Sequence, residues 1–203
     1  MKKPLRHFVL SLSIVAVLWC CGCATSVPKA PNVVARISRP PPGKALVNFH
    51  RPSSYAKSIG VPVFDVNGKM LADMRDASLF RIVCDPGETV FISWVQFVNW
   101  AEHATVIKAD LAPDKIYDIM VDVAPAWVSA NIVLTPLAKG DPRRAKLAEL
   151  ERQEECALPV KAGSSRVVEC EAKNHERIEQ IKRDFLGGEK SGRVKVLAKD
   201  DCR

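Results

Sequence analysis

From Lys44 onward, the hydrophobic residues come in short runs that are separated by turn residues about every ten positions. The runs are rich in Val, Ile and Phe, which favour β-strands. Strands are expected at residues 45–50, 61–66, 70–71, 78–84, 89–100, 104–111, 116–123 and 127–134. Seven or eight strands without intervening helices predict a mainly β domain over residues 44–138, an antiparallel β-sandwich in preference to a barrel.

Turn residues mark the connections between these strands. Asn67-Gly68 predicts a two-residue hairpin of type I′, because that turn needs positive φ at both central positions. Two further turns are expected at residues 85–88 and 113–115, where a proline presets one backbone dihedral angle.

The run 89–100 is apolar on both of its faces. One face carries Val90, Ile92, Trp94, Val98 and Trp100, and the other carries Phe91, Val95 and Phe97. If the sheet packs on one side only, just one of these faces is removed from water. We expect helices to cover the second face. The alternative is an exposed aromatic patch for a partner, glycan or lipid, and the same two possibilities apply to Trp127.

After residue 138 the pattern changes to that of helices. Asp141-Pro142 is an N-cap followed by proline at the first helical position, which predicts a helix over residues 143–156. Apolar residues at spacings of three and four, Ile178, Ile181 and Phe185, predict a second helix over residues 165–186. We expect the two to form a C-terminal helical hairpin within residues 139–203 that docks on the sandwich.

The amino terminus has the pattern of an export signal. A basic stretch precedes an apolar run of about a dozen residues, shorter than the roughly 20 that a membrane-spanning helix needs. The following Cys20-Cys21-Gly22-Cys23-Ala24 resembles the lipobox of bacterial lipoproteins, with residues 1–22 as the signal peptide and Cys23 as the lipidated residue. Cys21 is a weaker alternative site, and an ordinary secretory signal is a second alternative.

The lipobox resemblance implies a location for the protein. Cys23 would carry two or three fatty chains such as palmitate, which makes membrane attachment long-lived. Ala24 implies release to the outer membrane, with the domain in the periplasm, although bacteria with other sorting rules would retain the protein in the inner membrane. Residues 23–43 contain five prolines and are expected to form an extended tether.

Residues from about 43 to 136 resemble the bacterial family catalogued as domain of unknown function 2846. The motifs that carry the resemblance are Lys44-Ala-Leu-Val-Asn-Phe-His-Arg-Pro52, Phe64-Asp-Val-Asn-Gly68, Asp85-Pro-Gly-Glu88 and Leu111-Ala-Pro-Asp-Lys-Ile-Tyr117. The resemblance implies a small exported β-domain, often lipidated, with no established activity. The C-terminal helices lie largely outside it.

Composition and motifs give no sign of catalysis or nucleic-acid binding. Three of the 30 Lys and Arg residues precede the expected cleavage site, so the mature chain keeps 27 against 23 acidic residues, and these charges are scattered. The mature histidines His50, His103 and His175 show no metal-binding spacing. We therefore expect no cofactor, no metal site, no nucleic-acid partner and no enzymatic activity.

Four cysteines follow Cys23, an even number in an oxidising compartment. We favour a disulfide between Cys156 and Cys170, at one end of the expected helical hairpin. Cys84 would then pair with Cys202 and attach the tail to the sandwich. The alternative for Cys84 is a buried free thiol.

These features predict a membrane-anchored accessory or protein-interaction module of the cell envelope, which is not an enzyme. The first alternative is a periplasmic binder of a glycan or lipid that uses an aromatic patch of Trp94, Trp100 and Trp127. The second alternative is a hydrolase with dispersed catalytic residues.

Overall fold

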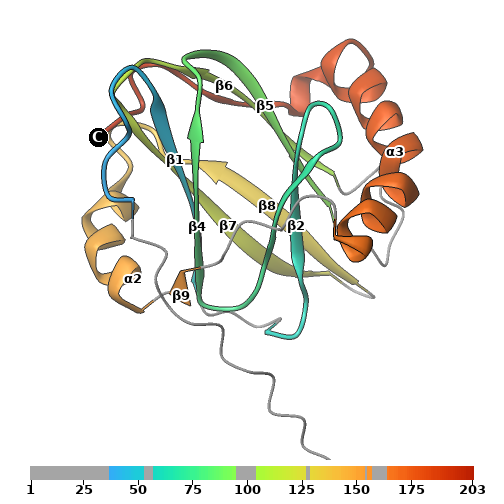
Figure 1. The fold of residues 1–203 in the computed structure, drawn as a ribbon, viewed down its shortest axis with the longest axis horizontal. Helices are drawn as coiled ribbons and strands as arrows, with labels where there is room; N and C mark the ends of the chain where they lie inside the picture. The colour runs from blue at the N-terminus through green and yellow to red at the C-terminus, as the bar shows by residue number, and fades with distance from the viewer. Residues whose placement is uncertain (1–36, 53–56, 95–103, 127–128, 154, 157–163) are drawn as a thin grey trace, which may run out of the picture. The chain divides into compact units, whose positions relative to one another are not determined.

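The computed structural model describes residues 37–52, 57–94, 104–126, 129–153, 155–156 and 164–203. These residues form two β-sheets and two helices, together with short 3-10 turns (Figure 1). The elements are β1 (Ala45–Arg51), β2 (Val61–Asp65), β3 (Met70–Met74), β4 (Ser78–Cys84), β5 (Gly87–Ser93), β6 (Thr105–Leu111), β7 (Ile116–Ala126), β8 (Ser129–Pro136), η1 (Pro142–Lys146), α2 (Leu147–Gln153), β9 (Glu155–Cys156), α3 (Ser165–Leu186), η2 (Ser191–Arg193) and β10 (Lys195–Leu197). The prediction of a mainly β, sandwich-like fold is confirmed.

Both sheets are mixed, which corrects the expectation of a wholly antiparallel sandwich. Sheet A has the order β8-β7-β1-β4-β9 and sheet B has the order β10-β6-β5-β2-β3. The pairs β1–β7, β4–β9 and β10–β6 are parallel. The turn after β6 brings the chain back beside the start of β1, where Asp114 N donates to Lys44 O at 2.7 Å. β7 therefore begins at the same end of the sandwich as β1 and runs alongside it.

The main core lies between the sheets and follows the alternation of each strand. In β1, Ala45, Val47 and Phe49 belong to this core. The Phe49 ring packs against the rings of Phe80 and Phe91, with centroids 5.9 and 5.1 Å apart. Residues at even positions of β1 consequently point to the outer face of sheet A.

Side chains from sheet B close the edge of sheet A at β8. Thr105 Oγ1 of β6 donates to Ile132 O at 2.8 Å, and Lys195 Nζ of β10 donates to Leu134 O at 2.7 Å. Burial lowers the pKa of Lys195, although Asp122 opposes this. These bonds use backbone acceptors that an edge strand otherwise offers to another chain.

Helix α3 covers the outer face of sheet B. Ile178, Ile181 and Phe185 of α3 form a second buried cluster with Ile92 and Trp94, whereas Phe91 faces the main core. The prediction that helices cover the second apolar face is confirmed for residues 89–94, and residues 95–100 lie outside the described part of the chain. The predicted bounds of α3 are also confirmed.

Helix α2 lies on the other sheet, so the expected helical hairpin is wrong. Leu147 of α2 packs with Met120 of sheet A and with Leu137, which follows β8, and Figure 1 shows α2 and α3 on opposite sides of the strands. Each helix has its own apolar stripe and each sheet has its own outer face, so the helices need not contact one another. Asp141 is an N-cap as predicted, since its carboxylate accepts from Arg143 N at 2.9 Å. It caps the 3-10 turn η1, however, and the predicted helix over residues 143–156 is wrong in extent because α2 spans only Leu147–Gln153.

The hairpin between β2 and β3 forms, although its turn is not of type I′. Asp65 N donates to Lys69 O at 3.0 Å and Gly68 N donates to Asp65 O at 3.1 Å, which makes a three-residue connection. Gly68 has φ of +81°, whereas Asn67 is not among the described residues with positive φ. The Asp65 carboxylate accepts from Asn67 N and Lys69 N, each at 2.9 Å. This local capping favours the longer turn.

Gly68→Ala is expected to destabilise the fold more than the matched change Gly43→Ala. Both glycines have positive φ, +81° and +75°, so each substitution costs about 1–2 kcal/mol of backbone strain. A Cβ at Gly68 would also lie 3.1 Å from Ile178 Cδ1, whereas nothing lies within 4 Å at Gly43. We expect about 1 kcal/mol more loss for Gly68→Ala in urea unfolding. In an Ile178→Val background, which lacks that Cδ1 atom, the excess should disappear; equal losses for the two single variants would contradict the prediction.

Candidate functional site

Three polar side chains are buried side by side on the outer face of sheet A. Asn48 and His50 occupy outward positions of β1, and Asp118 lies opposite Asn48 on the parallel neighbour β7. Asn48 is 1% exposed, and His50 and Asp118 are both 0% exposed. We call these three residues, with Arg81, Arg144, Glu151 and Arg203 around them, the polar cluster.

Asp118 is the centre of the polar cluster. Its Oδ1 atom accepts a hydrogen bond from Asn48 Nδ2 at 2.9 Å and lies 3.1 Å from His50 Nε2. Its Oδ2 atom lies 3.1 Å from Arg203 Nε and 3.8 Å from Arg144 Nη1. The carboxylate therefore has a polar or charged neighbour at each oxygen.

These neighbours determine the charge state of Asp118. Burial alone raises the pKa of this carboxyl group, but the hydrogen bond from His50, the charge of Arg203 and the hydrogen bond from Asn48 together outweigh that effect. The pKa of Asp118 consequently lies below its ordinary value. Asp118 is a buried carboxylate that keeps its negative charge at neutral pH.

An outer layer of the polar cluster joins α2 and the end of the chain to sheet A. Glu151 of α2 accepts a hydrogen bond from Arg203 Nη2 at 2.5 Å and another from Arg81 Nη2 of β4 at 3.2 Å. Arg203 N donates to Ile116 O at 2.9 Å. Arg144 donates to the carbonyl oxygens of Leu137, Ala138 and Asp201. These bonds connect four separate stretches of the chain.

A histidine beside a carboxylate is the arrangement that many hydrolases use to activate a nucleophile. In this chain neither His50 nor Asp118 has solvent-accessible surface, and arginines occupy the side of Asp118 that faces α2 and the C-terminal segment. A substrate therefore has no direct access to the pair. The contacts of the polar cluster hold strands, α2 and the C-terminal segment together.

Arg51 is a second buried charge, at the end of β1. It is 0% exposed, and its Nη1 atom donates to Met74 O at 2.5 Å. Burial lowers the pKa of Arg51, while the carboxylates of Asp76 and Asp73 raise it. This arginine links β1 to the end of β3 across the two sheets.

Among the predicted binding residues, Trp94 is placed in the interior. It is 0% exposed and its ring stacks on Phe64, with centroids 4.6 Å apart and planes at 10°. Its indole nitrogen has no hydrogen-bond partner among the described residues. Trp94 is thus not available to stack on a ligand, and Trp100, Trp127 and the lipidation site Cys23 lie outside the described residues.

The predicted disulfide between Cys84 and Cys202 is not formed, because both are free thiols in the structure. Cys84 ends β4, and Cys202 bridges to Tyr117 on the far side of β7, so β1 and β7 lie between them. Three strand spacings of about 4.8 Å separate the two cysteines, about twice the reach of a disulfide. Burial, with a contribution from Asp85, raises the pKa of Cys84 to about 11.

The other predicted disulfide stays a prediction. Cys170 lies on α3, where Asn174 Nδ2 is 3.3 Å from its Sγ atom. Cys156 belongs to the short strand β9, and its side chain lies outside the described structure.

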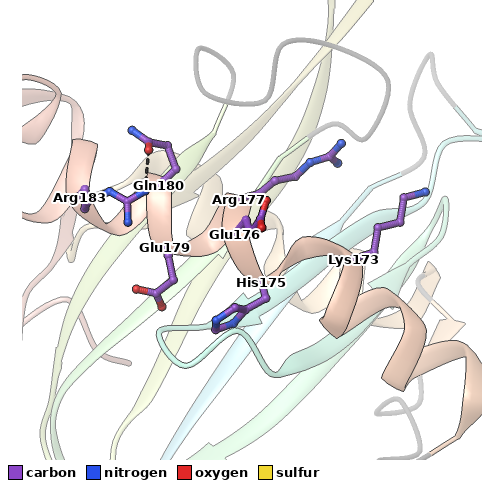
Figure 2. Close-up of a pocket in the computed structure, with 7 residues that line it drawn as sticks. All are labelled: Lys173, His175, Glu176, Arg177, Glu179, Gln180 and Arg183. Atoms are coloured by element: carbon purple, nitrogen blue, oxygen red, sulfur yellow. Dashed lines mark hydrogen bonds between the residues drawn. The ribbon is translucent and has the colours of Figure 1, made fainter.

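A shallow hollow of about 610 Å³ lies along the solvent side of α3 (Figure 2). It is lined by Lys173, His175, Glu176, Arg177, Glu179, Gln180 and Arg183. Figure 2 shows the hydrogen bond of 2.7 Å that Arg183 Nη2 donates to Gln180 Oε1. All seven residues come from one helix and their charges are mixed, so the hollow is typical of a solvated helix surface.

No group of three His, Cys, Asp or Glu side chains is placed to hold a metal ion in the described ranges. No helix in that part of the chain is long and apolar enough to cross a membrane. His175 lies on the exposed side of α3, and His103 is outside the described residues.

The sequence contained a signal for the polar cluster that residue-by-residue analysis missed. Asn48 and His50 interrupt the outward side of an apolar strand, and Asp118 does the same in another strand. Polar groups at outward positions of two apolar strands indicate a pair on one face, provided that the strands are neighbours. The parallel pairing of β1 and β7, which the sequence pattern does not reveal, supplies that condition.

Comparison of the chain with protein-family models, curated proteins and solved structures finds no match. The resemblance of residues 43–136 to the family named above therefore stays a prediction.

Asp118→Asn is expected to lower the free energy of unfolding by about 3 kcal/mol, since it removes the buried charge that pairs with the partly exposed Arg144 and Arg203. The matched change Asp110→Asn affects an exposed ion pair with Lys199, whose atoms lie 3.6 Å apart, and should cost less than about 1 kcal/mol. Urea unfolding at neutral pH measures both values. Equal losses would show that the polar cluster does not stabilise the fold through its charge.

The same substitution should change the pH dependence of stability. Because the native pKa of Asp118 is lowered, its carboxylate stabilises the fold above the unfolded pKa of about 3.9, and this stability is lost as the pH falls through the native pKa. Below about pH 4, the free energy of unfolding should therefore fall more steeply for the wild type than for Asp118→Asn.

Proposed function

We propose that this protein is a membrane-anchored accessory or protein-interaction module of the cell envelope and not an enzyme. The observation that carries the proposal is the burial of His50 and Asp118 at the centre of the polar cluster. His50 and Asp118 are the pair in the described structure that most resembles catalytic groups, and both are 0% exposed. Because their polar contacts stabilise the fold, we assign the function to contacts at the protein surface.

The sequence supports the anchoring part of the proposal. Cys23 follows the apolar signal run, and residues 23–43 form a proline-rich stretch that leads directly to β1 at Ala45. A lipid on Cys23 would hold the domain at the periplasmic surface of a membrane, the outer membrane by the rule based on Ala24. Its partners would be the bilayer and another component of the envelope.

A glycan or lipid binder is the second candidate, and one observation favours it. Segments 95–103 and 127–128, which carry Trp100 and Trp127, join the ends of β5 and β6 and the ends of β7 and β8. Thr105 Oγ1 bonds to Ile132 O, so these strand ends lie at the same end of the sandwich. The burial of Trp94 removes the third tryptophan from this candidate site.

Cys23→Ser should abolish the lipid modification and release the chain from membranes. Metabolic labelling with palmitate and separation of membrane and soluble fractions measure both effects. Cys21→Ser is the matched control, because Cys21 is the weaker alternative site and its loss should leave labelling and fractionation unchanged. Retention of label in Cys23→Ser, or its loss in Cys21→Ser, would contradict the assignment.

Tryptophan emission distinguishes the two candidate functions. A non-binding accessory module should show no change in emission when the protein is titrated with envelope glycans or with vesicles of envelope lipids. Quenching that is lost in Trp100→Ala or Trp127→Ala, but kept in a variant with Lys173→Ala on α3, would favour the ligand binder instead.

A further inference from the structure

Helix α2 and the last residues of the chain share one set of contacts on sheet A. We propose that α2 and residues 198–203 form a single cover, closed by the ion pairs of Arg203, which opens as a unit before the sandwich unfolds. We call this unit the latched cover. The proposal concerns a conformational device of the fold and does not depend on the proposed function.

The helix of the latched cover is weakly held by apolar contacts. α2 has seven residues, and a helix of this length is not stable alone. Its apolar support consists of Leu147 and the partly buried Leu150 against Met120 and Leu137. Helix α3, by contrast, has 22 residues and contributes to a cluster that includes two large aromatic side chains of sheet B, Phe64 and Trp94.

Charged contacts supply the remaining attachment of the cover. Arg203 reaches inward to Asp118, with Nε 3.1 Å from Oδ2, and outward to Glu151, with Nη2 2.5 Å from Oε1. Glu151 also pairs with Arg81 of β4 at 3.2 Å. The Arg203 side chain is 34% exposed and that of Glu151 is 26% exposed, so water reaches this ion pair from one side.

Besides the Arg203–Glu151 pair, the C-terminal half of the cover is bonded to the residues that lead into α2. Lys139 N donates to Asp201 Oδ1 at 3.1 Å, and Arg144 of η1 donates to Asp201 O. The Asp201 carboxylate also accepts from Ala198 N at 3.0 Å, which closes the C-terminal segment on itself. Release of either half therefore breaks contacts of the other, and the two should open together.

Opening of the cover would expose one strip of sheet A and leave most of the sandwich core packed. That strip contains Asn48, His50 and Asp118. The residues beneath α3 form a separate cluster, and Cys202 is the one described residue of the cover that packs against the main core, so most of that packing is kept. Local opening of a weakly packed unit is the ordinary behaviour of such segments.

Hydrogen exchange of the full-length protein in mild detergent tests the proposal. In the wild type, amides of α2 and the Arg203 amide, which donates to Ile116 O, should exchange faster than those of β5 and β6. Arg203→Ala should speed exchange in α2 by about tenfold or more, and exchange in β5, β6 and α3 by less than about twofold. Lys199→Ala removes only an exposed ion pair between the C-terminal segment and Asp110 of β6, so it should leave exchange in α2 unchanged.

A second variant tests the coupling within the cover. Glu151→Gln keeps the size of the side chain and removes the charge that holds Arg203 and Arg81, so it should speed exchange of the Arg203 amide although that amide lies 52 residues away. The effects of Glu151→Gln and Arg203→Ala should be less than additive when combined. Unchanged α2 exchange in Arg203→Ala, equal acceleration of all strands, or full additivity would each overturn the proposal.

Discussion

The arrangement of elements on sheet A depends on one buried negative charge, the carboxylate of Asp118. Removing such a group from water costs several kcal/mol unless charges and hydrogen-bond donors replace the water. Asn48 and His50 supply donors from β1, and Arg203 and Arg144 supply positive charge from the chain that follows β8. The pairing of Arg203 with Asp118 thus holds the C-terminal segment against sheet A.

The two outer faces of the sandwich are covered by different kinds of contact. Sheet B presents Ile92 and Trp94, and α3 meets them with a stripe of large apolar residues whose burial needs no exact geometry. Sheet A presents the polar cluster, and α2 meets it with few apolar residues and with Glu151. Directional contacts are lost abruptly when a partner moves, whereas apolar packing weakens gradually. The cover on sheet A should therefore open more easily than α3 on sheet B.

Much of the fold could be predicted from the sequence because its signals are local. Alternating apolar runs located the strands, and the spacing of Ile178, Ile181 and Phe185 located α3. The parallel pairs, the strand β10 and the separation of the two helices could not be predicted, since they depend on which sheet each strand joins. The polar cluster was missed for the same reason: its members are 70 residues apart, and only the pairing of β1 with β7 unites them.

The polar cluster also determines which helix covers which sheet. If α3 lay on sheet A in place of η1 and α2, Asp118 would lose Arg144 of η1 and the Glu151 contact that holds Arg203, which is pairing worth about 3–5 kcal/mol. If α2 lay on sheet B, its two leucines would leave the indole of Trp94 and the ring of Phe64 largely in water. Because both exchanges are costly, the correct placement of the helices follows from the chemistry of the two faces. A polar group that is costly to bury on the face of a small sandwich thereby selects a single arrangement of the chain.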